Sequence, residues 1–232
     1  MSPDTRPAIF FDALGTLFDL TPPQVIFSRV LSALGRELGE EEAARLLSRA
    51  NRWWLDPSRP PSRTTEEELD ERRVYVRLFM EEYGHARDAA LAEQLEEQAY
   101  WARWAQPFSD AEPVLQELQP EYRLAVLSNG GPSSLDAVRY AGLGGYFEQM
   151  YAGLELGAQK PDARAYELAA QRLGVSLQDS WLVDDTAANA EGGMTAGMRV
   201  VFLSRQGGSP GDSAPTIASL AELPKLLKTY MR

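Results

Sequence analysis

The chain has 232 residues, 44% of them apolar, which is enough for one domain core with a sizeable insertion. Its formal net charge of −11 argues against nucleic acid or anionic lipid as partners, because both repel an acidic surface. There is no cysteine, and His85 is the single histidine, so disulfides, thiolate metal sites and polyhistidine zinc sites are excluded. Any metal ion must therefore be held by oxygen ligands.

The N-terminal residues combine prolines and charges with only a short apolar stretch. Neither a signal-peptide core nor a membrane-spanning helix is expected from such a segment. We therefore expect no membrane partner and a cytoplasmic location, while the oligomeric state is left open by the composition.

Short apolar runs mark the strands of a predicted sheet. Residues 8–11 form a continuous apolar run, as expected of a strand that is covered on both faces. Similar runs occupy residues 124–127, 181–183 and 199–203, and a weaker one occupies residues 149–152. Because segments with helical periodicity precede the later strong runs, the pattern predicts a Rossmann-like parallel α/β sheet flanked by helices.

Residues from about 21 to 104 contain no convincing strand and are predicted to form helices. Thr21 followed by two prolines is typical of an N-cap, and Thr65 followed by three glutamates is typical of a capping box. We therefore predict an all-helical subdomain at 21–104. It is inserted into an α/β core made of residues 1–20 and 105–232.

Polar residues follow the predicted strands, where the loops of an open α/β sheet converge on one crevice. An isolated aspartate at a strand end is often only a turn or a helix cap. Four polar groups in one chain order are not explained by capping. These groups are Asp12, Ser128-Asn129-Gly130, Lys160-Pro161-Asp162 and Asp184-Asp185.

Here the sequence resembles a known family. Residues 11–19, Phe-Asp-Ala-Leu-Gly-Thr-Leu-Phe-Asp, are similar to the first motif of the haloacid dehalogenase superfamily. Residues 127–129, 160–161 and 183–189 resemble its other three motifs in order and spacing. The resemblance extends from about residue 9 to 203. The inserted helices resemble the family's C1-type cap, which closes over the pocket.

The resemblance implies a hydrolase with a small-molecule anionic substrate. Asp12 would be the nucleophile and would form a covalent intermediate. Ser128 and Lys160 would bind the transferring anion, with Lys160 also holding Asp12 ionised, and the backbone amides before the helix at Pro132 could add donors. We assign substrate binding to Thr16, Asn129, Gly130 and Asn189.

The resemblance also implies Mg²⁺ as the cofactor. Asp12, Asp185 and the backbone carbonyl of Leu14 would be its ligands, which suits a hard cation. Asp184 would support these ligands, together with Asn189. The alternative is that Asp184 and Asp185 only cap the following helix. Two adjacent carboxylates repel each other without a cation, which favours the metal site.

Leu14 departs from the phosphatase pattern. Phosphatases of this family usually have a second aspartate at this position, which serves as general acid and base. One interpretation is a subfamily that protonates its leaving group by other means. The others are changed chemistry or lost catalysis.

Carbon–halogen cleavage is the first changed chemistry. Residues 124–130, 136–143 and 160–169 resemble 2-haloacid dehalogenases, which also lack the second aspartate. Those enzymes, however, have tyrosine at the position of Leu14, and their fourth motif has Ser and Asn in a metal-free arrangement. A dehalogenase would also need a cap arginine to receive halide, and the candidates are Arg36, Arg45, Arg49 and Arg52.

Phosphonate cleavage through a Schiff base is excluded, because residues 21–104 contain no lysine. A catalytically silent binding module is the remaining alternative from another class. It does not account for a full set of Asp12, Ser128, Lys160 and Asp185. Because the fourth-motif carboxylates decide whether metal binds, we expect a Mg²⁺-dependent phosphatase, with a 2-haloacid dehalogenase as the alternative.

Overall fold

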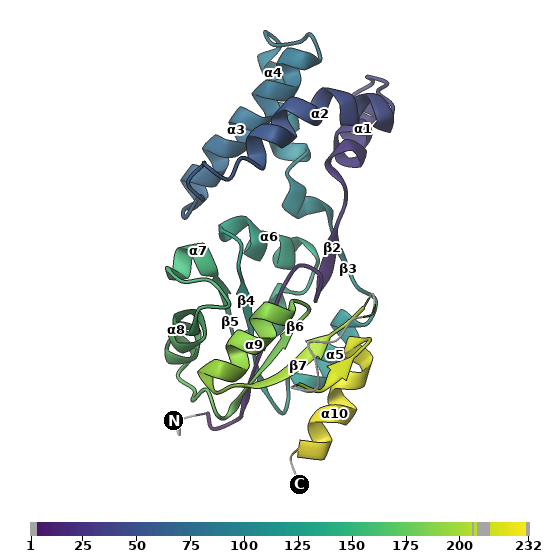
Figure 1. Cartoon of the computed structure of the whole chain (residues 1–232). Helices are drawn as coiled ribbons and strands as arrows, with labels where there is room; N and C mark the ends of the chain where they lie inside the picture. Colours follow the sequence, from purple (N-terminus) through teal and green to yellow (C-terminus); the bar gives the residue numbers. More distant parts are fainter. Residues whose placement is uncertain (1–3, 206, 208–213, 231–232) are drawn as a thin grey trace.

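A parallel six-stranded sheet forms the centre of the computed structural model, which describes residues 4–205, 207 and 214–230 (Figure 1). The strand order is β5-β4-β1-β6-β7-β8, and every neighbouring pair is parallel. The predicted Rossmann-like α/β fold is therefore confirmed. The strands are β1 (Ala8–Phe11), β4 (Arg123–Ser128), β5 (Gln149–Ala152), β6 (Ser180–Asp184), β7 (Arg199–Leu203) and β8 (Thr216–Ile217).

Helices cover both faces of this sheet, which explains why its central strands are apolar throughout. In β1, Ile9 and Phe11 pack with α5, α6 and α10, whereas Ala8 and Phe10 pack with α7, α8 and α9. All four side chains are buried. The helices are α5 (Ala111–Leu118), α6 (Pro132–Tyr140), α7 (Gly153–Leu156), α8 (Ala163–Leu173), α9 (Ala187–Ala196) and α10 (Leu223–Tyr230), with short 3-10 turns η2 (Gly144–Tyr146) and η3 (Leu220–Glu222).

Four further helices form a separate group at one end of the molecule (Figure 1). We call α1 to α4 the cap helices, and they surround an apolar cluster of their own around Leu47 and Phe79. The division of the chain at residues 21 and 104 stays a prediction. The cap helices are α1 (Pro23–Ala33), α2 (Glu40–Trp54), α3 (Thr65–Glu82) and α4 (Ala89–Gln98), followed by the 3-10 turn η1 (Trp101–Trp104).

Two short strands join the cap helices to the sheet. β2 (Phe18–Leu20) and β3 (Ala105–Pro107) pair antiparallel, so the chain leaves and returns at the same place. The Thr21 hydroxyl donates to the carbonyl of Trp104 over 2.8 Å and ties the two crossings together. The prediction that Thr21 is the N-cap of α1 is wrong, because Pro22 occupies that position.

The predicted capping box of α3 begins one residue earlier than expected. The Thr64 side chain accepts from the amide of Glu67, and Glu67 accepts in return from the amide of Thr64. Two consecutive threonines before three glutamates satisfy the pattern in either register, so the sequence does not distinguish them. As a result Glu68 takes no part in the box.

None of the helices in the described part of the chain is long and apolar enough to cross a membrane.

Helix α9 approaches the loop before α8 very closely. A Cβ placed on Gly192 would lie 2.5 Å from the carbonyl oxygen of Pro161 and 2.9 Å from the hydroxyl of Tyr166. A Cβ on Gly193 would lie 2.8 Å from a methyl group of Leu182. Glycine at these two positions therefore lets α9 pack against both the sheet and the loop that carries Lys160.

We predict that Gly192→Ala destabilises the protein although alanine is the better helix former. Helix propensity would contribute up to about 1 kcal/mol in favour of alanine. The contact with a backbone oxygen cannot relax cheaply, and overpacking costs about 1–3 kcal/mol. Thermal unfolding measures the difference, with Glu191→Ala on the exposed side of α9 as the control. A Gly192→Ala variant more stable than wild type would contradict the packing described.

Candidate active site

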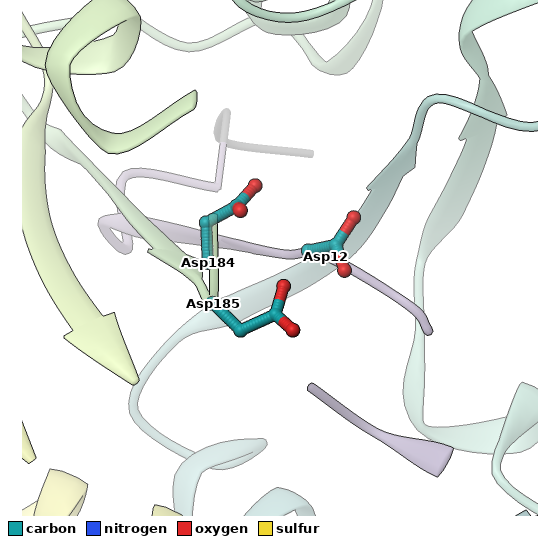
Figure 2. A group of neighbouring side chains, drawn as sticks. All are labelled: Asp12, Asp184 and Asp185. Atoms are coloured by element: carbon teal, nitrogen blue, oxygen red, sulfur yellow. The ribbon is translucent and has the colours of Figure 1, made fainter. Parts of the chain in front are cut away.

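The ends of three neighbouring strands bring the predicted site residues together. Asp12 follows β1, Ser128 ends β4, and Asp184 ends β6, while β1 lies between β4 and β6 in the sheet. Figure 2 shows Asp184 and Asp185 leaving adjacent positions in different directions, close to Asp12. The parallel sheet thus makes one group from residues far apart in the sequence.

Lys160 reaches this group from the loop between α7 and α8. Its Nζ donates to Oδ1 of Asp12 over 2.7 Å and to Oδ2 of Asp184 over 2.6 Å, and its side chain has no exposed surface. Burial opposes the charge of the ammonium, but the two carboxylates raise the pKa of Lys160 above its ordinary value. The ammonium therefore stays charged and fixes the orientation of Asp12.

Asp12 is almost completely buried. Burial raises the pKa of its carboxyl to about 7, while the charge of Lys160 acts in the opposite direction and the charges of Asp184 and Asp185 raise it further. Three carboxylates thus lie near one ammonium, which contacts two of them. A bound cation would offset the excess negative charge and favour the ionised form of Asp12.

The donor set fits such a cation. Asp12, Asp184 and Asp185 each offer an oxygen within 4.8 Å of the others. Asp184 already accepts hydrogen bonds from the amide of Thr186 over 2.9 Å and from the Lys160 ammonium. The side-chain amide of Asn189 also donates to both of its carboxylate oxygens, over 3.1 and 3.2 Å. Asp12 and Asp185 keep oxygens that can bind a metal ion, whereas Asp184 is suited to hold its neighbours in place.

Gly15 lies directly against Asp185. Its φ of +84° favours glycine, and a Cβ at this position would lie 2.1 Å from Oδ2 of Asp185. The absence of a side chain therefore allows the turn after Asp12 to touch the fourth-motif carboxylate. Leu14 precedes this turn with 46% of its surface exposed, so the position of the usual second aspartate is open to solvent.

An arginine that the sequence analysis missed holds the same turn. Arg205 donates through Nη2 to the carbonyl of Thr16 over 2.8 Å and through Nε to that of Gly15 over 3.3 Å. It also forms a bidentate pair with Asp110 at 2.9 and 3.0 Å. No local pattern links two residues so far apart in the sequence. Thr16 itself is fully buried, and its hydroxyl has no hydrogen-bond partner within the described residues.

The segment after β4 supports the Lys160 loop. Asn129 donates through Nδ2 to the carbonyl of Lys160 and accepts through Oδ1 from its amide, both over 2.7 Å. Gln159 donates to the carbonyl of Asn129. The Asn129 side chain is therefore engaged in positioning Lys160, so the substrate contact expected of Asn129 would fall to its backbone amide.

Ser128 and Gly130 lie side by side in this segment. The Ser128 hydroxyl accepts from the amide of Gly130 over 3.4 Å, which leaves its proton available for a ligand. A Cβ on Gly130 would lie 2.8 Å from Cβ of Ser134. Glycine therefore lets the segment fold tightly onto α6. Asn189 is buried against Asp184, as its two hydrogen bonds show.

Of the four cap arginines considered as halide ligands, Arg36 lies between α1 and α2 and the other three lie in α2. Arg36 pairs with Asp88 over 2.7 Å, Arg45 with Glu42 over 2.5 Å and Arg49 with Glu81 over 2.8 Å. Arg52 is exposed. Three of the four thus have acidic partners within the cap helices.

We predict that Lys160→Met lowers the free energy of unfolding by about 3–5 kcal/mol, the usual cost of removing one partner from a buried ion pair. Asp12 and Asp184 would be left as buried carboxylates without a counter-charge. The double variant Lys160→Met/Asp184→Asn should recover part of this loss, because it removes one of them. Urea unfolding measures both variants, with Asp184→Asn alone as the control. A double variant no more stable than Lys160→Met would show that unpaired charge is not the cause.

Comparison with known proteins identifies the family of this arrangement. The family model for haloacid dehalogenase-like hydrolases matches residues 7–197. An (S)-2-haloacid dehalogenase of Pseudomonas sp. (strain YL) is 38% identical over 103 residues, which cover 44% of each chain. The N-acylneuraminate-9-phosphatase of Rattus norvegicus is 31% identical over 127 residues, which cover 52% of this chain and 51% of that one.

The chain therefore spans about half the length of the curated relatives it matches. Among solved structures, a 2-haloacid dehalogenase from Pseudomonas syringae pv. Tomato DC3000 superposes with a TM-score of 0.67 at 25% identity, covering 97% of this chain and 100% of that one. Dehalogenases and phosphatases both occur among the relatives, so the reaction is not settled by likeness. The chain belongs to the haloacid dehalogenase-like hydrolases.

Proposed function

We propose that the protein is a Mg²⁺-dependent phosphatase that hydrolyses a small phosphomonoester through an aspartyl-phosphate on Asp12. The observation that carries the proposal is the placement of Asp185 beside Asp12, with the oxygens of Asp184 already engaged. This arrangement leaves two carboxylates for a cation, in the donor chemistry that Mg²⁺ prefers.

In the proposed reaction the Asp12 carboxylate attacks phosphorus, and the bond from phosphorus to the ester oxygen breaks. Lys160 holds Asp12 in place, the Ser128 hydroxyl and the amide of Asn129 bind phosphoryl oxygens, and the Gly130 amide orients that hydroxyl. Mg²⁺, held by Asp12, Asp185 and the Leu14 carbonyl, would supply charge that offsets the phosphoryl oxygens. Water then attacks phosphorus, which releases phosphate and restores the Asp12 carboxylate.

The leaving alcohol obtains its proton from solvent in this proposal. Leu14 cannot donate one, and its exposure gives water access to the position. An N-acylneuraminate-9-phosphatase among the relatives supports a phosphorylated small molecule as the substrate class. A small-molecule partner and a cytoplasmic location stay expectations of the sequence.

The alternative function is that of a 2-haloacid dehalogenase. It is favoured by the lack of an acid at Leu14 and by the (S)-2-haloacid dehalogenase among the relatives. The acidic partners of Arg36, Arg45 and Arg49 argue against it, because a paired guanidinium is a poorer halide ligand. A catalytically silent module is the third possibility.

A paired assay tests these functions directly. Phosphate release from a panel of small phosphomonoesters and halide release from 2-chloropropionate are each measured with Mg²⁺ and with EDTA. We expect phosphate release that EDTA abolishes. Halide release that EDTA does not affect, without phosphatase activity, would establish the dehalogenase. A silent module would show neither activity.

Leu14→Asp tests the missing general acid. A positioned acid typically contributes about 10²–10⁴-fold, so the wild-type enzyme should favour aryl phosphates, whose leaving groups depart without a proton. The substitution should accelerate hydrolysis of alkyl phosphates more than that of aryl phosphates. Because nearly half of the Leu14 surface is exposed, a carboxylate there should cost little stability.

The measurement is kcat/KM of wild type and Leu14→Asp for alkyl and for aryl phosphates, with thermal unfolding as the control for folding. An equal loss for both classes in a folded Leu14→Asp variant would mean that another group already donates the proton.

A further inference from the structure

Helix α6 begins without a cap from its own segment. Its N-cap residue is Gly131, which has no side chain, and Pro132 at the first helical position has no amide hydrogen. The amide of Ser133 is therefore the first that needs a partner. This helix start follows directly on Ser128, Asn129 and Gly130, which the proposed function uses to bind the anion.

The partner comes from the cap helices. Glu68, in the first turn of α3, accepts through Oε2 from the amide of Ser133 over 2.7 Å and through Oε1 from its hydroxyl over 2.8 Å. A carboxylate at a helix N-terminus is favoured by the helix dipole, and hydrogen bonds to a charged acceptor are stronger than neutral ones. Glu68 is available because Glu67 closes the capping box of α3.

Gly131, just before α6, lies in close contact with the start of α3. A Cβ at this position would lie 2.2 Å from Oε1 of Glu68 and 3.1 Å from the carbonyl oxygen of Ser62. A side chain here would displace the Glu68 carboxylate from its place beside Ser133 and crowd the backbone before α3. The neighbouring Gly130 is bonded to Ser128 through its amide, so the cap contact and the anion-binding groups belong to one short stretch of backbone.

A second contact lies one turn further along α3. The Arg72 guanidinium stacks over the ring of Tyr100 at 4.2 Å, and the Tyr100 hydroxyl donates to Asp136 of α6 over 2.9 Å. Because Glu68 and Arg72 are four residues apart, they lie on the same face of the helix. This face of α3 therefore meets α6 directly at Glu68 and indirectly, through Tyr100, at Arg72. Glu68 is the contact beside the proposed anion-binding stretch.

We propose that Glu68 is a positioning residue of the active site, which caps α6 from the cap helices and thereby holds the anion-binding backbone of residues 128–131 in its working arrangement. The inference rests on the proposed function, because that function gives residues 128–131 their role. Glu68 does not touch the reacting atoms. Its loss should weaken binding of the phosphoryl group more than it slows the bond-breaking step.

The test compares Glu68→Ala and Glu68→Gln with Glu66→Gln, which removes the same charge from an exposed position in the same turn of α3. Hydrogen exchange of the peptide around Ser133 reports the contact itself. Inhibition by inorganic phosphate, and KM and kcat for an aryl phosphate, report its effect on the site.

We expect Glu68→Ala to speed exchange at Ser133 and to raise both KM and the inhibition constant of phosphate about tenfold, as the loss of a hydrogen bond to a charged group implies. The value of kcat should change less. Glu68→Gln should lie between Glu68→Ala and wild type, because its amide can still accept from the Ser133 amide and donate to the hydroxyl. Glu66→Gln should behave as wild type.

Exchange or KM unchanged in Glu68→Ala would overturn the proposal, as would equal effects in Glu66→Gln. A loss of stability without any change in KM would also overturn it, since it would mean a merely structural contact. Failure of the proposed function is distinguishable, because it would appear in the wild-type protein as absent phosphate release. In that case exchange and phosphate binding in the variants would still decide for or against Glu68.

Discussion

The buried ammonium of Lys160, held between Asp12 and Asp184, is the interaction on which the site depends. It joins the ends of two strands to a loop that enters from between two helices. A charge so deeply buried is tolerated only with close partners, which accounts for the 2.6 and 2.7 Å contacts. The surrounding structure serves to keep this loop in place: Asn129 holds the backbone of Lys160 from one side, and α9 packs on Pro161 from the other.

Glycines occur where two segments of the site meet. Gly15 touches Asp185, Gly131 touches Glu68, and Gly192 touches Pro161. In each case a side chain would separate a residue of the proposed chemistry from the element that supports it. The site is thus assembled from close loop contacts over a rigid sheet, and the cap helices take part through Glu68. This arrangement links the position of α3 to the geometry of residues 128–131, the proposed anion-binding backbone.

Much of this arrangement could be predicted from the sequence, because strands buried on both faces leave a clear apolar signal. The five strands expected from apolar runs are present, and their polar end residues converge as parallel strands require. The short strands β2, β3 and β8 were missed, since two or three residues show no periodicity. The Arg205–Asp110 pair and the contact of Glu68 with Ser133 join residues distant in sequence, and only the fold reveals them.

The proposed function depends first on Asp12 as the nucleophile toward phosphorus. The most direct measurement mixes the protein with Mg²⁺ and an aryl phosphate, quenches the mixture in acid and analyses the peptide that contains Asp12 by mass spectrometry. We expect a phosphoryl group on Asp12 that is absent when EDTA is present and absent in Asp12→Asn. A phosphoryl group on another residue, or turnover in Asp12→Asn near that of wild type, would contradict it.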